Sequence, residues 1–167
     1  MMDQLKSSNL LIIGGAGYIG SHMVAFAQEQ GINVVVLDDL STGHREMVAM
    51  DVPFYQGDLS DVVLLKSIFS QHAITAVMHF AAHIEVAESV QYPGKYYQNN
   101  VAKTISLLNA MIECRIKYFI FSSTAAVYGE PRTDKISETH VKAPINPYGL
   151  SKWMVEQICQ DYASAYD

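Results

Sequence analysis

Nine residues near the N-terminus, GGAGYIGSH at 14–22, restrict the fold of this chain more than any other stretch. They follow a continuous apolar run, NLLIIG at 9–14, and lead into a segment at 18–31 whose apolar residues recur at helical spacing. A short apolar run bounded by glycine is typical of a buried parallel strand, and a terminal glycine such as Gly31 is typical of a helix end. The glycine-rich stretch is therefore predicted to join a strand directly to a helix.

Strand-like and helix-like segments continue to alternate along the rest of the chain. We predict further strands at 33–39, 53–59, 76–82 and 118–123, helices at 61–72 (capped by Ser60) and about 95–115, a loop at 130–147, and a last helix starting near Tyr148. Alternation of this kind predicts an α/β fold with a doubly wound parallel sheet, the Rossmann type, covered by helices on both faces.

The number of predicted strands points to an incomplete sheet. Five strands are visible in the sequence, whereas doubly wound sheets commonly have about six or more. The fifth strand would then have a bare edge, which folded proteins usually cover. We therefore expect one truncated Rossmann domain over 1–167, with residues 1–8 as a flexible N-terminal tail.

Composition excludes several classes of function. Half of the residues are hydrophobic, 17% are charged, and the formal net charge is −6 without a cluster of lysine or arginine. These values argue against a disordered chain, a nucleic-acid partner and an anionic membrane surface. Cys114 and Cys159 lie far apart without a CxxC pattern, and the N-terminal apolar run is too short for a signal peptide or a membrane span. We expect reduced thiols and a cytoplasmic protein.

The glycine spacing GxxGxxG, formed by Gly14, Gly17 and Gly20, is typical of a site for a dinucleotide pyrophosphate. Gly14 would permit the tight turn, Gly17 would let the backbone approach the phosphates, and Gly20 would let helix and strand pack closely. The phosphates would lie at the N–H groups and positive dipole of the helix N-terminus. A turn followed by a closely packed helix, without any ligand, is the alternative.

Two aspartates lie at the ends of the next two predicted strands. Asp38 lies 18 residues after Gly20 (38 minus 20), close to the roughly 20 expected for the carboxylate that binds the ribose 2′-hydroxyl and so favours NAD over NADP. Arg45 is the nearest candidate for reversing that preference. Asp58 would accept a hydrogen bond from the adenine amino group. The alternatives are a solvated acid at a strand end for Asp38 and a turn or helix-capping aspartate for Asp58.

Five motifs occur in a fixed order: GGAGYIGSH, GDL, HFAA, SSTAAVYG and YGLSK. With them the chain resembles the extended short-chain dehydrogenase/reductase family, and within it the nucleotide-sugar 4-epimerases, from about Asn9 to its last residue. The resemblance implies NAD as cofactor, a UDP-sugar as substrate, and three catalytic residues: Tyr148 as base, Lys152 as its partner, and Thr124 as a hydrogen-bond partner of the reacting hydroxyl. The cofactor-binding residues that it implies are Gly14, Gly17, Tyr18, Ile19, Gly20, Asp38, Asp58, Leu59, Phe80, Ala81, Ala82, Asn99, Ser122, Tyr148 and Lys152.

The Tyr148–Lys152 pair also has a physical argument of its own. A free tyrosine has a pKa near 10 and is a weak base at neutral pH, whereas an ammonium one helical turn away favours the phenolate. Within the family, dehydratases place an acid directly after the threonine. Here Ala125 and Ala126 follow Thr124, which favours simple return of the hydride and hence epimerisation. Which UDP-sugar is used stays open.

The family chain is roughly twice as long, and its second half supplies most of the uridine-nucleotide site. We therefore expect the C-terminal substrate domain to be missing and the isolated chain to be inactive. The alternatives are a non-catalytic NAD-binding module and a truncated fragment. The family also commonly dimerises through helices matching 95–115 and the last helix, so a homodimer is an expectation. His79 and His83 fall on a strand end and a loop, which argues against a metal site.

Overall fold

The computed structural model describes residues 9–131 and 133–166, so the tail predicted at 1–8 lies outside the described residues. Five strands form one parallel sheet in the order β3-β2-β1-β4-β5. Their bounds are β1 (Asn9–Ile13), β2 (Asn33–Asp38), β3 (Phe54–Gln56), β4 (Ala76–His79) and β5 (Tyr118–Phe121). The prediction of a parallel α/β sheet of Rossmann type is confirmed.

The helices differ from the sequence prediction in three places. Their bounds are α2 (Tyr18–Glu29), α3 (Val62–Gln71), α4 (Val86–Gln91), α5 (Pro93–Tyr96), α6 (Lys103–Glu113) and α7 (Pro147–Tyr166), with 3-10 helices at Arg45–Met47 and Ala125–Tyr128. α4 was not predicted. The helix expected at about 95–115 is divided into α5, a π-helical segment at Tyr97–Ala102, and α6. The predicted cap of α3, Ser60, is wrong: the Asp61 side chain accepts the hydrogen bond from the Leu64 N–H.

The chain divides into two compact units. The sheet unit comprises residues 1–81 and 106–122, and the helical unit comprises residues 82–105 and 123–167. All five strands belong to the sheet unit, while α4, α5, the π-helical segment and α7 belong to the helical unit. That residues 1–167 act as one domain stays a prediction.

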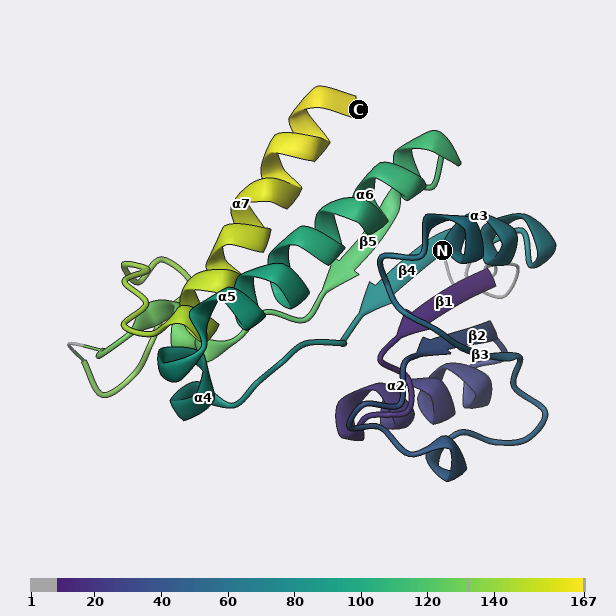
Figure 1. The fold of residues 1–167 in the computed structure, drawn as a ribbon, viewed down its shortest axis with the longest axis horizontal. Coiled ribbons are helices and arrows are strands. Elements are labelled where there is room, and N and C mark those ends of the chain that lie inside the picture. Colours follow the sequence, from purple (N-terminus) through teal and green to yellow (C-terminus); the bar gives the residue numbers. More distant parts are fainter. Residues whose placement is uncertain (1–8, 132, 167) are drawn as a thin grey trace. The chain divides into compact units, whose positions relative to one another are not determined.

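The core of the sheet unit follows from the alternation of side chains along each strand. Leu10, Ile12, Val34 and Val36 face α2 and form one buried cluster with its residues Val24 and Ala27. The intervening residues Leu11, Ile13, Val35 and Leu37 are also buried, because successive strand residues point to opposite faces and α3 covers the other side (Figure 1). Both faces of the central strands are thus apolar, which explains why these strands read as continuous apolar runs.

In the helical unit, α7 is the element against which the other helical segments pack. The π-helical segment, α4, α5 and the 3-10 helix Ala125–Tyr128 all contact it. Its buried positions are Gly149, Ser151, Lys152 and Val155. The unit is therefore a small helical assembly built around the first half of α7.

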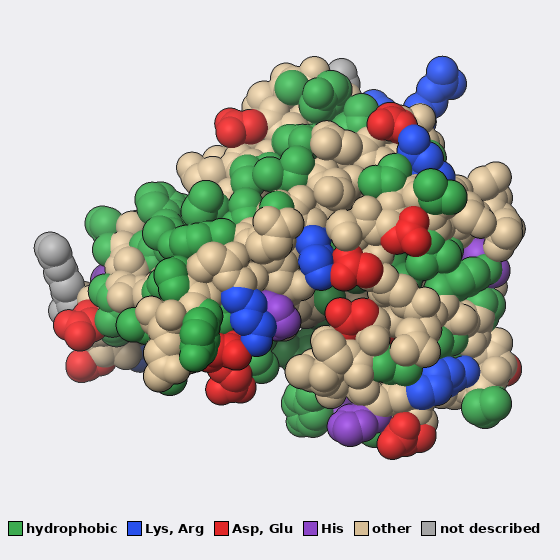
Figure 2. Space-filling view, in the orientation of Figure 1, with side chains coloured by type: hydrophobic (Ala, Val, Ile, Leu, Met, Phe, Trp, Pro, Cys, Tyr) green, Lys and Arg blue, Asp and Glu red, His purple; other side chains and the backbone are tan. Residues whose placement is uncertain are grey.

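Charged side chains of both signs are mixed on the surface. On the face shown in Figure 2, lysine and arginine side chains lie among acidic and apolar ones. Over residues 9–131 and 133–166, no helix has both the length and the apolar character that crossing a bilayer requires.

Candidate active site

The glycine-rich turn between β1 and α2 is compact, and two of its glycines are required by the chain itself. Gly14 has a φ of +78°, and a Cβ there would lie 2.5 Å from the Ala81 nitrogen. A Cβ on Gly20 would lie 2.1 Å from the Gly14 carbonyl oxygen, closer than any real contact. The turn and the approach of helix to strand therefore exclude side chains at both positions.

Gly17 differs from the other two. It caps α2 with φ −78° and ψ 173°, a conformation open to any residue. A Cβ there would meet only the Gly14 oxygen, at 3.4 Å, which is ordinary contact. Tyr18 and Ile19 follow with exposed side chains, and the first N–H groups of a helix have no partner within it. Nothing in the surrounding packing requires a glycine at 17, so the bare backbone leaves room beside these N–H groups.

Asp38 ends β2 with its carboxylate directed at this turn. Its Oδ2 accepts a hydrogen bond from the Ala16 N–H and its Oδ1 one from the Leu40 N–H, both at 2.9 Å. The residue is 7% exposed, so it is not the solvated strand-end acid of the alternative interpretation. A carboxylate has about four acceptor positions, and two of them are used by these bonds.

Asp58 has the geometry of a turn residue. Its Oδ1 accepts hydrogen bonds from the Ser60 N–H at 2.7 Å and the Ser60 hydroxyl at 2.6 Å. This supports the turn alternative, and a contact between Asp58 and adenine stays a prediction. Leu59 beside it is buried, at 8% exposure.

The remaining predicted residues of the sheet unit lie where β1, β4 and β5 end. The Phe80 N–H donates to the Ile13 carbonyl at 2.8 Å, and the Ser122 N–H donates to the His79 carbonyl at 3.1 Å. Ala81 contacts Gly14 through its backbone nitrogen. Phe80, Ala81 and Ser122 therefore share the carboxyl edge of the sheet with the glycine-rich turn, the edge at which ligands of open α/β sheets bind.

In the helical unit, the start of α7 is fixed by its cap. The Asn146 side chain accepts a hydrogen bond from the Gly149 N–H at 2.8 Å, and Pro147 occupies the first helical position, where its fixed φ fits and no N–H is needed. Tyr148 is half-buried. Lys152 follows one turn later on the same face and is only 3% exposed.

Burial has an electrostatic consequence for Lys152. Loss of solvation disfavours its charged form and lowers its pKa from 10.5 to about 8. At pH 7 the side chain is still mainly an ammonium ion, because the pKa remains above the pH. A positive charge is thus kept in a poorly solvated position one turn from the Tyr148 phenol.

Thr124 caps a short helix that packs against the beginning of α7. This is the 3-10 helix Ala125–Tyr128, and the Thr124 Oγ1 accepts a hydrogen bond from the Ala126 N–H at 3.2 Å. A Cβ on Gly149 would lie 2.6 Å from the Ala126 carbonyl oxygen, so α7 touches this short helix at the residue after Tyr148. The hydroxyl proton of Thr124 is not used by the bond to Ala126 and can be donated to another group.

Glu156, about two turns after Tyr148 on α7, also holds the segment that contains Thr124. The Glu156 carboxylate accepts a hydrogen bond from the Ser123 hydroxyl and forms an ion pair with Lys142. Glu156 therefore connects α7 both to Ser123, the residue before Thr124, and to Lys142 in the loop before α7. The Lys142 pKa is raised, first by its hydrogen bond to Glu156. Neither Ser123 nor Glu156 was among the site residues expected from the sequence.

Asn100, in the π-helical segment, links three parts of the helical unit. Its Oδ1 accepts a hydrogen bond from the His83 N–H at 2.9 Å, and its Nδ2 donates to the His83 carbonyl at 3.0 Å. The same Nδ2 donates to the Ser151 hydroxyl at 3.1 Å, and that hydroxyl donates to the Tyr148 carbonyl at 2.7 Å. Asn99, the predicted cofactor residue, is half-buried beside it and donates to the Asn100 Oδ1 at 3.1 Å.

Replacing Asn100 with leucine is expected to destabilise the chain by about 2–4 kcal/mol. The amide is 3% exposed, and its loss leaves the His83 N–H and carbonyl without this partner in a confined place. Urea unfolding followed by circular dichroism measures the change. Gln98→Leu, at an exposed position, is the matched control, and an equal shift in both variants would contradict the linking role of Asn100.

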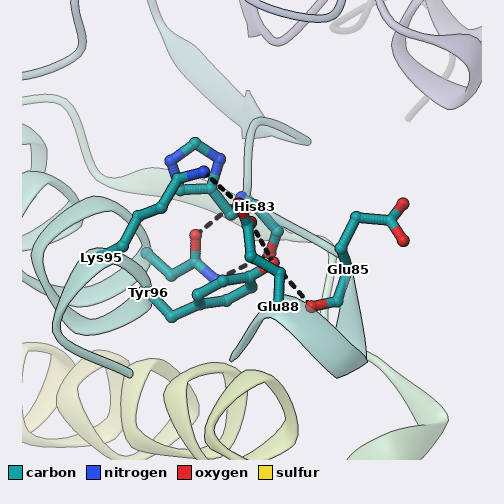
Figure 3. A network of polar contacts seen from close by, with 6 residues as sticks. His83, Glu85, Glu88, Lys95 and Tyr96 are labelled. Carbon is teal, nitrogen blue, oxygen red and sulfur yellow. Dashed lines mark hydrogen bonds and ion pairs between the residues drawn. The ribbon is translucent and has the colours of Figure 1, made fainter. Parts of the chain in front are cut away.

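Next to this link, a buried tyrosine organises the start of α4 and α5 (Figure 3). The Tyr96 hydroxyl donates to the Glu85 carbonyl at 2.6 Å and contacts the Glu88 carboxylate at 2.9 Å, while Lys95 pairs with Glu88 at 2.6 Å. Burial, followed by the Glu88 hydrogen bond, raises the pKa of Tyr96 to about 12. Tyr96 is therefore a neutral structural group.

The predicted site residues fall into two sets. Gly14, Gly17, Tyr18, Ile19, Gly20, Asp38, Asp58, Leu59, Phe80, Ala81 and Ser122 belong to the sheet unit, and Ala82, Asn99, Thr124, Tyr148 and Lys152 to the helical unit. Within residues 9–131 and 133–166, no group of three or more His, Cys, Asp or Glu side chains is arranged to hold a metal ion.

The sequence of the chain matches a known protein family and several curated relatives. The profile of the NAD dependent epimerase/dehydratase family matches residues 10–167. The chain is 52% identical over 149 residues to the UDP-glucose 4-epimerase of Lactobacillus helveticus, covering 89% of this chain and 45% of that protein. It is 46% identical over 167 residues to the UDP-glucose 4-epimerase of Azospirillum brasilense, covering 99% and 48%.

Solved structures give the same result. The UDP-glucose 4-epimerase from Brucella ovis in complex with NAD superimposes with a TM-score of 0.92 at 46% identity, covering 96% of this chain and 49% of that one. The UDP-Glc/GlcNAc 4-epimerase from Campylobacter jejuni gives a TM-score of 0.90 at 44% identity, covering 95% and 50%. The chain spans about half the length of the relatives it matches. It belongs to the NAD dependent epimerase/dehydratase family.

Proposed function

We propose that this chain carries the NAD site and the catalytic residues of a UDP-sugar 4-epimerase, with UDP-glucose as the favoured substrate. The observation that carries the proposal is the assembly of Thr124, Tyr148 and Lys152 within one compact unit, in which the 3-10 helix capped by Thr124 packs against the turn that bears Tyr148. The matched relatives named UDP-glucose 4-epimerase support the reaction and the sugar.

The sheet unit has features that fit NAD. Gly17 leaves an uncovered backbone at the N-terminus of α2, where N–H groups and the helix dipole favour phosphate. Asp38 keeps two acceptor positions beyond its bonds to Ala16 and Leu40, enough for the hydroxyl groups of a ribose. Tyr18, Ile19, Asp58, Leu59, Phe80, Ala81 and Ser122 complete the proposed cofactor site within this unit. Ala82 and Asn99, which belong to the helical unit, stay predictions.

The proposed chemistry assigns a distinct task to each catalytic residue. NAD, when bound, supplies the hydride acceptor that also returns the hydride. Tyr148 takes the proton of the substrate 4-hydroxyl as C4 is oxidised, and gives it back when the 4-keto sugar is reduced on its other face. The Lys152 ammonium stabilises the phenolate form of Tyr148. Thr124 holds the reacting oxygen in place through its hydroxyl.

The residues after Thr124 support epimerisation over dehydration. Ala125 and Ala126 have no group that transfers protons, so elimination of water from the keto sugar lacks an acid at this position. Ala126 serves the fold instead: its N–H donates to the Thr124 hydroxyl oxygen, and its carbonyl oxygen lies where a Cβ on Gly149 would stand 2.6 Å away.

Purified 167-residue protein is expected to bind NAD with a stoichiometry near one and to show no turnover of UDP-glucose by itself. Calorimetry, together with NAD released on denaturation, measures the first property, and a coupled assay measures the second. Absence of NAD binding would contradict the proposed cofactor site. Turnover by the isolated chain would contradict the expectation that it needs further residues.

A complementation assay tests the catalytic residues. The C-terminal half of the Lactobacillus helveticus relative, supplied as a separate polypeptide, is expected to give epimerisation with this chain and none with its Tyr148→Phe variant. NAD binding without complementation would favour a non-catalytic binding module, and failure of both would favour a fragment. Cytoplasmic location and a homodimer stay predictions. Two apolar residues of the stretch 95–115 expected to form a dimer contact, Val101 and Leu108, are buried within the chain itself.

A further inference from the structure

We propose that Arg45 is held in an intramolecular latch that keeps its guanidinium away from Asp38, and that this latch strengthens the selection of NAD against NADP. The latch consists of the Arg45 side chain, the Phe54 ring and the Val48 carbonyl. The inference rests on the proposed NAD site and adds a second determinant to it. All of the residues involved belong to the sheet unit.

The segment after β2 brings Arg45 close to the proposed ribose position along the chain. A Cβ on Gly43 would lie 2.9 Å from the Ala16 Cβ and 3.0 Å from the Asp38 Oδ1, so the chain at 43 lies directly on the glycine-rich turn. The His44 N–H then donates to the Ala16 carbonyl at 3.0 Å. Arg45 is the next residue, and an arginine near this position is how dinucleotide sites of this fold accommodate a 2′-phosphate.

The Arg45 side chain nevertheless makes its contacts elsewhere. Its Nη1 donates to the Val48 carbonyl at 2.7 Å, and its guanidinium carbon lies 4.5 Å from the centroid of the Phe54 ring, within the range of a cation–π interaction. Arg45 is half-buried in this position. Both contacts engage the guanidinium, the part of the side chain that would have to bind a phosphate.

The register between β2 and β3 shows that the Phe54 ring, which contacts the Arg45 guanidinium, starts at the end of the strand pair away from Asp38. Phe54, the first residue of β3, pairs with Val36, whereas Asp38 pairs with Gln56 at the carboxyl end. Two residues of a parallel strand span about 6–7 Å. The ring that holds the guanidinium thus starts from the amino-terminal end of β3, and Asp38 lies at the opposite end of the same ladder.

Other cations of the sheet unit are poorly placed to replace Arg45. Lys66 on α3 forms an ion pair with Glu113, and Arg115 and Lys117 precede β5, at the amino end of that strand. Among the described residues of this unit, Arg45 is accordingly the cation whose release would favour NADP. The negative charge of the Asp38 carboxylate repels a 2′-phosphate. The latch keeps the positively charged Arg45 guanidinium in a place where it does not offset this repulsion.

The test compares NAD and NADP binding by calorimetry in four forms of the full chain: wild type, Asp38→Asn, Asp38→Asn with Phe54→Leu, and that double variant with Arg45→Met added. Asp38→Asn removes the repulsive charge. Phe54→Leu keeps an apolar side chain and removes the aromatic face, which is expected to raise NADP affinity by about three- to fivefold over Asp38→Asn. Adding Arg45→Met is expected to abolish that gain and leave NAD affinity unchanged.

Equal NADP affinities with and without Arg45 in the Phe54→Leu background would overturn the inference while leaving NAD binding intact. Failure of the wild type to bind NAD would overturn both this inference and the proposed function. A measurement on the wild type avoids any folding problem of the variants: the ring-current shift of the Arg45 δ protons is expected to persist when millimolar NADP is added. Its disappearance with NADP would equally overturn the latch.

Discussion

Lys152→Met is expected to raise the free energy of unfolding by about 2–3 kcal/mol at pH 7. Burial lowers the Lys152 pKa from 10.5 to about 8, and each unit of that difference corresponds to about 1.4 kcal/mol spent on keeping the ammonium in the folded chain. Methionine has a similar length and no charge, so the replacement removes this cost with little change of packing. Urea unfolding at pH 7 measures the difference.

The pH dependence provides a sharper form of the same prediction. Lys152 loses its proton near pH 8 in the folded chain and near pH 10.5 in the unfolded chain. Between these values the unfolded chain binds more protons, so the contribution of Lys152 makes stability rise with pH. The stability difference between Lys152→Met and wild type is therefore expected to shrink from pH 8 to pH 10.5.

Lys142→Met is the matched control, because the pKa of Lys142 is raised by its hydrogen bond with Glu156. The sign is then opposite: the pair stabilises the fold below the unfolded pKa, and the contribution is lost as pH rises through the folded pKa. Lys142→Met is expected to be less stable than wild type at pH 7. A pH-independent difference for Lys152→Met would show that burial of its charge costs nothing.

A stabilising replacement at Lys152 also bears on function. An ammonium ion that weakens the fold is retained one turn from Tyr148, which is expected of a residue kept for chemistry rather than for packing. Loss of the charge would leave the Tyr148 phenolate without its proposed partner. The same variant should therefore be more stable and, in the complementation assay, inactive.

The sequence sufficed for the parallel sheet because its strands are buried on both faces. β1 and β2 each contain four consecutive apolar residues, a pattern typical of strands whose two faces are both covered by helices. Helix boundaries were harder to predict from the sequence than the strands. The π-helical segment at Tyr97–Ala102 is a local change of hydrogen-bond spacing within a continuous helical stretch. No glycine or proline in that segment marks it in the sequence. α4 is only 6 residues long, too short to show a period.

The sequence predicted those parts of the candidate site whose local geometry a motif determines. It could not predict the contacts that join segments far apart in the chain. Asn146 followed by Pro147 is an ordinary signature of a helix start, and this pair directly precedes Tyr148. By contrast, Asn100 and Ser151 are 51 residues apart, and Glu156 and Ser123 are 33 apart. No periodicity relates such pairs, so only the folded chain reveals that they hold Thr124 and Tyr148 in place.

Gly17→Ala and Gly20→Ala are expected to separate binding from folding within one turn. A Cβ on Gly20 would lie 2.1 Å from the Gly14 oxygen and 2.9 Å from the Gly15 Cα. Both neighbours are backbone atoms that cannot rotate away. Relief requires moving the start of α2 from β1, so Gly20→Ala is expected to lose about 3 kcal/mol or more of stability, comparable to other severe steric changes.

Gly17→Ala places its Cβ 3.4 Å from the Gly14 oxygen, in ordinary contact and with an allowed backbone conformation. Its stability is expected to stay within about 1 kcal/mol of wild type. The methyl group would nevertheless project beside the uncovered N–H groups of α2, where the proposed pyrophosphate approaches. NAD affinity is therefore expected to fall at least about tenfold, as for the loss of about 1.4 kcal/mol.

Urea unfolding and calorimetric titration with NAD, performed on both variants, distinguish the two effects. Gly31→Ala serves as a remote control: a Cβ there meets nothing within 4 Å, but its φ of +74° makes any side chain strained, so it should lose stability and keep NAD affinity. If Gly17→Ala bound NAD as tightly as the wild type, the bare backbone at 17 would have no part in cofactor binding. The surrounding chain does not require a glycine at this position, so this variant tests the proposed cofactor site most directly.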